Sequence, residues 1–186
     1  MRTSSHLLLG RTLADHTPLL SAYPLRRNLF LLGNIVPDFI PFTYFTGFRT
    51  PPRTAGHSLP YSQPKIAKKI KKGRSLGFHS AGDAFRLGLL MHYLSDSFTY
   101  PHTLEYHGTK KEHTAHEKAL CAVLPEFLFL VNTTEPACSP EFLAEAKRQY
   151  DALPPSLTRD AEWIVKVCSA VFFSVLSVNE KGKDLP

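Results

Sequence analysis

The 186-residue sequence has few cysteines and no long apolar segment. Its three cysteines, Cys121, Cys138 and Cys168, are odd in number and widely separated, which argues against a disulfide framework and against a CxxC zinc knuckle. The longest apolar run, residues 167–178, is interrupted by serines and is too short to cross a bilayer. We therefore expect reduced thiols and no membrane-spanning segment.

The start of the sequence also lacks the features of a secretory signal. Residues 1–6 are followed by no long apolar core and by no small-residue cleavage site. Together with the scattered cysteines, this predicts a cytoplasmic protein.

No alternating pattern typical of β-strands is present, and apolar residues instead recur at helical spacing. The length suits one domain that buries its own core. We predict a single all-α domain over residues 1–186, in which residues 5–117 carry the motifs and helices within 140–178 complete a multi-helix bundle. The other helices are expected near residues 4–15, 25–32, 65–72, 80–99 and 112–131.

Several local signals set the expected helix ends. Ser4 or Ser5 is predicted to cap the first helix, and Ser156 or Thr158 the last. Gly33 is predicted to end the second helix, so that the Pro-Asp pair at 37–38 lies in a turn. Ser80 and Asp83 resemble a capping box at the start of the central helix, and Pro125 is expected to kink the helix that contains it.

The histidine count is unusual: the chain has nine histidines, and five of them lie between positions 92 and 116. Two of these histidines are followed four residues later by a carboxylate: His92 by Asp96 and His113 by Glu117. This i, i+4 spacing places both side chains of a pair on one face of a helix. Two such helices facing each other would present imidazoles and carboxylates, the nitrogen and oxygen ligands that Zn²⁺ takes. The sequence thus predicts a multinuclear metal site built on His92, Asp96, His102, His113 and Glu117.

Other candidates lie outside this stretch. Asp38 stands in an apolar context, where an ion or hydrogen-bond partner is needed, although an Asx-type turn after Pro37 is the alternative. His6 and His57 are further candidate ligands, with His79 as the rival of His57. Three histidines are expected to lie away from the site and in solvent: His16, His107 and His116.

The patterns His92-x3-Asp96-x5-His102 and His113-x3-Glu117 resemble the zinc-dependent phospholipase C family, an all-α group related to the single-strand-specific zinc nucleases. Ser5-His6 and the Pro-Asp pair ending at Asp38 also fit its pattern, and the resemblance covers residues 5–117. It implies two or three zinc ions per chain. The implied ligands are Asp38, His57, His92 and Asp96 for the first, His102, His113 and Glu117 for the second, and Asp96 with His6 for the third.

Phosphodiester hydrolysis is the reaction most natural to clustered zinc, because the metal activates water and neutralises phosphate oxygens. Asp38 would ligate metal or orient the attacking water. We therefore expect a phospholipase C-like hydrolase acting on a lipid or small-molecule phosphodiester. The alternatives are a zinc nuclease or nucleotide phosphoesterase, and a non-catalytic metal-binding domain, since Met1 and Arg2 stand where secreted members of the family carry a Trp that completes the third site.

A basic stretch and an aromatic stretch suggest partners. The net charge of +6 allows an anionic partner. The lysines of a short predicted helix would attract an anionic membrane surface or, less favourably, nucleic acid, although a solvated basic helix is the simpler interpretation. The aromatics between Phe39 and Phe48 would line a lipid or base pocket or pack as ordinary core. The lysines are Lys65, Lys68, Lys69, Lys71 and Lys72.

Overall fold

The structure is a computed structural model that describes residues 1–39, 66, 70, 78–131 and 138–177. The candidate ligand His57 lies outside the described residues, as do the five lysines of the basic stretch. Of the aromatic residues from Phe39 to Phe48, only Phe39 is described. Ile66 and Ile70 are described, and both are helical and buried.

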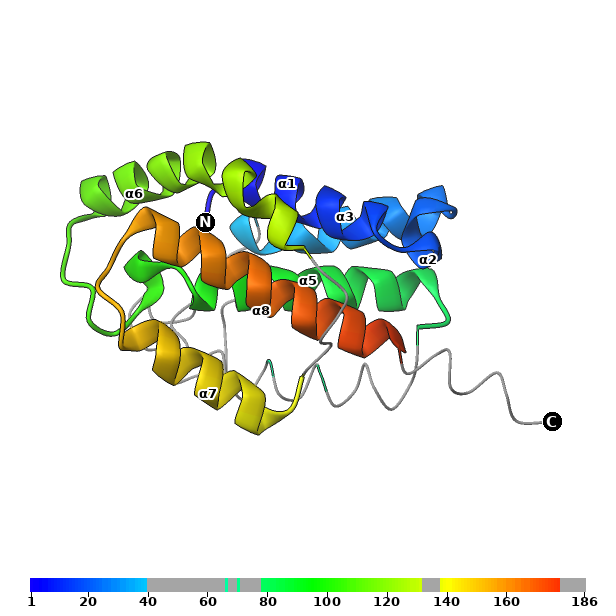
Figure 1. Cartoon of the computed structure of the whole chain (residues 1–186). Coiled ribbons are helices and arrows are strands. Elements are labelled where there is room, and N and C mark those ends of the chain that lie inside the picture. Colours follow the sequence, from blue (N-terminus) through cyan, green and yellow to red (C-terminus); the bar gives the residue numbers. More distant parts are fainter. Residues whose placement is uncertain (40–65, 67–69, 71–77, 132–137, 178–186) are drawn as a thin grey trace, which may run out of the picture.

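The described part of the chain is helical and contains no strand, which confirms the all-α prediction (Figure 1). None of its helices combines the length and the apolar composition that a bilayer crossing needs. In order, the elements are α1 (Thr3–Asp15), α2 (Pro18–Ser21), α3 (Pro24–Phe39), α5 (Ala81–Ser97), the 3₁₀ helix η3 (Tyr100–His102), α6 (Lys110–Val123), the 3₁₀ helix η4 (Leu124–Leu130), α7 (Pro140–Asp151) and α8 (Leu157–Ser177).

The first helix begins earlier than expected. Its N-cap is Arg2, which makes no side-chain capping bond, so the predicted cap at Ser4 or Ser5 is wrong and both serines lie inside α1. The short α2 was not expected; the hydroxyl of Thr17 accepts a hydrogen bond from the Leu19 amide at its start. The position of α1 matters because it carries His6.

The largest difference concerns Gly33, which does not end a helix. Helix α3 continues through Gly33 and Pro37 to Phe39, so Asp38 lies on a helix rather than in a turn. A Cβ on Gly33 would lie 2.2 Å from the Phe85 carbonyl oxygen, and a Cβ on Gly88 would lie 2.1 Å from that of Phe30. The two glycines therefore allow the backbones of α3 and α5 to touch.

The other helix ends follow the sequence signals closely. Ser80 and Asp83 form a capping box at the start of α5. The Ser156 hydroxyl accepts a bond from the Arg159 amide at the start of α8. At Pro125 the chain passes from α6 into η4, so the expected irregularity takes the form of a 3₁₀ helix.

Helix α5 lies in the middle of the bundle, packed against α3 and crossed by α8 (Figure 1). The core contains the fully buried side chains of Phe30, Phe98, Tyr150 and Phe172. The three cysteines are free, as expected. Towards its C-terminal end α5 buries polar side chains, and these begin the candidate site.

Candidate metal centre

The site begins with His92 and Asp96, one turn apart near the end of α5. Both side chains are buried, and the Nε2 atom of His92 lies 3.3 Å from the Oδ2 atom of Asp96. The helical period places them on one face, as the i, i+4 spacing predicts.

The orientation of the His92 ring is fixed by α3. Its Nδ1 atom lies 2.8 Å from the carbonyl oxygen of Asn34, which accepts the Nδ1–H hydrogen bond. The Nε2 atom is then left with its lone pair, directed towards Asp96 and, at 4.0 Å, towards Oδ1 of Asp38. This is the tautomer of a metal-ligating histidine whose other ring nitrogen donates to a carbonyl.

His6 on α1 is arranged in the same manner. Its Nδ1 atom lies 3.2 Å from the Ser95 hydroxyl, which itself donates to the carbonyl oxygen of His92. Its buried Nε2 atom lies 3.4 Å from Oδ1 of Asp96 but has no hydrogen bond among the described residues. Burial and the neighbouring His92 lower the pKa of His6 to about 3, so the ring is neutral, as a zinc ligand must be.

Asp38 is the exposed member of this first group. Its side chain keeps 21% of its surface accessible, and the Thr3 hydroxyl donates a 2.7 Å hydrogen bond to Oδ2. Partial burial raises the pKa of the Asp38 carboxyl. One donor atom from each of His6, Asp38 and His92 lies within 4.8 Å of the others.

A second group of donors joins η3 to α6. The Oε1 atom of Glu117 lies 2.9 Å from Nε2 of His113 and 3.3 Å from Nε2 of His102. Burial opposes the charge of Glu117, but the bonds from the two histidines and the amino group of Met1 outweigh it and hold the pKa of Glu117 far below its usual range. These three residues also present donor atoms within 4.8 Å of one another.

Asp96 lies between the two groups. One of its oxygens faces His6 at 3.4 Å and His102 at 4.0 Å, and the other faces His92. The amino group of Met1 forms an ion pair with Asp96 and another, at 3.2 Å, with Glu117. Burial opposes ionisation of Asp96, but this cation and the three histidines hold its pKa well below its usual range.

These residues fit zinc on observations that are independent of any resemblance. A buried imidazole nitrogen of His6 has no hydrogen bond among the described residues, and a positive charge is already accommodated between Asp96 and Glu117. The donors are the imidazole nitrogens and carboxylate oxygens that zinc takes as ligands. The structure thus brings together the predicted ligands that it describes, although it groups His6 with Asp38 and His92.

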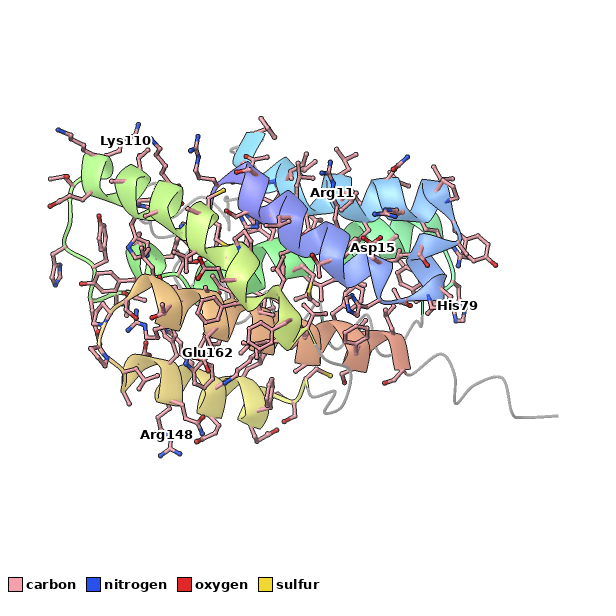
Figure 2. The ribbon with its side chains drawn as sticks, turned by 45° about the horizontal axis from the view of Figure 1, so that its top comes forward. Arg11, Asp15, His79, Lys110, Arg148 and Glu162 are labelled. Carbon is pink, nitrogen blue, oxygen red and sulfur yellow. The ribbon has the colours of Figure 1, made fainter. Side chains whose placement is uncertain are left out.

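The remaining histidines have different positions. His79 is exposed, at the N-terminal end of α5, and Figure 2 shows it at the opposite end of the molecule from Lys110, where α6 begins. It therefore lies outside both donor groups. His16 and His107 are exposed, as expected. His116 is not: its side chain is only 18% accessible, and it contacts Asp160 at 2.8 Å.

The error at His116 has a physical reason. His116 follows His113 by three residues and directly precedes Glu117, so it borders the face that carries them, and its side chain meets Asp160 of α8 rather than solvent. Sequence reasoning also missed Thr3, Asn34 and Ser95, which orient the ligands. Ser95 lies in an apolar helix between two ligands, and this was the available signal; nothing in the sequence marked the Asn34 carbonyl.

The described part of the chain is thus a helical bundle whose helices bring together two groups of imidazole and carboxylate donors that could hold metal ions. A family model for zinc-dependent phospholipase C matches residues 5–171. The chain belongs to this family of zinc-dependent hydrolases. The match extends well beyond Glu117, where the sequence resemblance had ended. Searches of the curated proteins and of the solved structures each returned no match.

Proposed function

We propose that the protein is a zinc-dependent phosphodiester hydrolase that acts on a phospholipid-type phosphodiester. The observation that carries the proposal is the position of Asp96 between two groups of donors, because it keeps the groups close enough to act on one phosphate. Family membership supports the same reaction class.

Two or three zinc ions per chain are proposed. Asp38, His92 and Asp96, with His57, would hold the first; His102, His113 and Glu117 would hold the second. His6 would share Asp96 with a third ion or join the first group, near which the structure places it. Bound zinc supplies Lewis acidity, which neutralises phosphate oxygens and lowers the pKa of coordinated water.

The chain's own contribution centres on Asp38. Its carboxylate is accessible to solvent, and the Thr3 hydroxyl fixes one of its oxygens. The other oxygen faces His92, so Asp38 either ligates metal or accepts a proton from an attacking water. The burial of His6 and His92 keeps bulk water away from the inner side of the site.

The test is zinc content and hydrolysis measured on the same preparations, purified without chelator or a His tag. We expect two or three zinc ions per chain, and loss of about one in each of His92→Ala and His113→Ala. Hydrolysis of a phospholipid in mixed micelles should disappear with chelator and return with Zn²⁺. A protein that binds zinc but hydrolyses no phosphodiester would instead be a non-catalytic metal-binding member of the family.

A zinc nuclease is the second candidate, favoured by the net charge of +6. It predicts binding to single-stranded DNA that weakens steeply with salt, with a slope of roughly 0.7 for each phosphate contacted. A flat salt response, with turnover of the phospholipid, would exclude it. The proposed attraction of the stretch containing Lys65, Lys68, Lys69, Lys71 and Lys72 to an anionic membrane surface remains a prediction, because these residues lie outside the described part of the chain.

A further inference from the structure

One fully buried carboxylate outside the donor groups connects the elements that carry the second group. Asp160, in the first turn of α8, has no solvent-accessible surface. Its Oδ2 atom accepts a 2.7 Å hydrogen bond from the backbone amide of Tyr100 and contacts Nε2 of His116 at 2.8 Å.

Both contacts lead directly to proposed zinc ligands. Tyr100 begins η3, which ends at His102, and His116 directly precedes Glu117 on α6. The loop between η3 and α6 is otherwise exposed over residues 107–109. A single oxygen atom of Asp160 therefore contacts both elements that carry the second donor group, η3 and α6.

The other oxygen of Asp160 is held separately. Oδ1 accepts hydrogen bonds from the Tyr150 hydroxyl at 2.8 Å and from Nη2 of Arg159 at 3.1 Å. Burial and the charge of Asp160 raise the pKa of Tyr150, which keeps its hydroxyl protonated as a donor. These bonds fix the carboxylate from the side of α7 and α8, away from the ligands.

We propose that Asp160 is a positioning residue for the second zinc: through Tyr100 and His116 it sets the distance between His102 and the pair His113 and Glu117. The proposal rests on zinc binding to this group, as proposed above. Partners that orient ligands typically contribute about 10–100-fold to metal affinity. A purely structural ion pair between Asp160 and Arg159 would stabilise the fold without distinguishing one zinc from the other.

The experiment measures stepwise zinc affinity of the full chain by competition with a chromophoric chelator. Asp160→Ala removes both links, and His116→Phe removes only the link to α6 while keeping a ring. We expect each to weaken one zinc, by about 10–100-fold for Asp160→Ala, and to leave the affinity of the first group unchanged. His116→Gln, whose amide can donate to Asp160 again, should restore part of the affinity.

Two controls identify the zinc and the cause. In a His113→Ala background, which lacks the second zinc, Asp160→Ala should not alter the zinc that remains. Tyr150→Phe removes the bond to Oδ1 and the bond that the hydroxyl accepts from Arg159, but no bond to Oδ2, so it should lower thermal stability and leave both zinc affinities intact. Asp160→Ala also leaves Arg159 without its anion, which affects folding. The comparison of His116→Phe with His116→Gln therefore tests the positioning role independently of Asp160→Ala.

Unchanged zinc affinity in His116→Phe would overturn the inference, and so would unchanged affinity in Asp160→Ala if that variant folds. Equal weakening of every zinc, or the same loss in Tyr150→Phe, would overturn it as well. Failure of the proposed zinc binding has a different signature, because the unaltered chain would then bind no zinc at the second group; absence of hydrolysis alone leaves this inference standing.

Discussion

The imidazole rings of His6 and His92 stack with their centroids 4.0 Å apart, although the residues come from α1 and α5. Two charged imidazoles would repel each other in this arrangement. Burial lowers the pKa of both rings, so the stack forms between neutral side chains. Each neutral ring therefore keeps a nitrogen lone pair, which a metal ion could bind.

This stack predicts how the zinc-free protein responds to acid. The unfolded His6 protonates near pH 6.5, whereas its folded pKa is about 3, so between these values only the unfolded chain binds the proton. Stability present above pH 6.5 is consequently lost as the pH falls, by up to about 1.4 kcal/mol per pH unit from this residue.

Urea unfolding of zinc-free protein, measured from roughly pH 7 to pH 5, checks this expectation. His6→Gln should flatten the profile, whereas the exposed control His16→Gln should leave it unchanged. A free energy of unfolding that does not vary over this range in the unaltered chain would show that His6 is not buried as a neutral ring.

Asp96→Ala is expected to weaken zinc binding at both donor groups, because Asp96 faces His92 with one oxygen and His6 and His102 with the other. The matched control is Asp83→Asn on the same helix, where the carboxylate caps α5 through Ser80 and pairs with Arg86 but contacts no proposed ligand. The control should cost about 1 kcal/mol of stability and keep all zinc. Loss of just one zinc in Asp96→Ala, measured by metal analysis, would mean that Asp96 belongs to one group alone.

Asp38→Asn is expected to lower kcat by about 10²–10⁴-fold, whether the carboxylate ligates zinc or accepts a proton from water. Thr3→Val, which removes only the hydrogen bond to Oδ2, should lower kcat by about 10-fold. Zinc content separates the two roles: a ligand loses metal on substitution, and a base keeps it. Hydrolysis rates equal to those of the unaltered protein would remove Asp38 from the mechanism.

Gly33→Ala and Gly88→Ala should each destabilise the fold by about 3 kcal/mol, because the added Cβ would meet a carbonyl oxygen of the facing helix at close to 2 Å. Gly82→Ala is the control: its Cβ would lie 3.6 Å from the Ser80 hydroxyl, an ordinary contact, and the substitution should stabilise α5 by up to about 1 kcal/mol. The denaturant midpoints of the three variants test this. Midpoints of Gly33→Ala and Gly88→Ala equal to that of the unaltered protein would show that α3 and α5 tolerate separation.

The sequence already contained the helical class and most of the chemistry of the site. The i, i+4 pairs His92 with Asp96 and His113 with Glu117 need only the helical period to share a face, so local geometry is sufficient to predict them. The capping box at Ser80 is equally local. These features depend on residues within a turn or two of each other.

Helix packing decided the rest, because it depends on contacts between residues far apart in the sequence. Gly33 looked like a helix end, but it permits α3 to touch α5, and this contact carries the Asn34 carbonyl to His92 and Asp38 to the site. Likewise, the position of α8 decides whether His116 on α6 meets water or Asp160. Residue spacing along one helix determines which side chains share a face, because the helical period is local. Only the tertiary structure determines which residues that face contacts, because those residues are distant in the sequence.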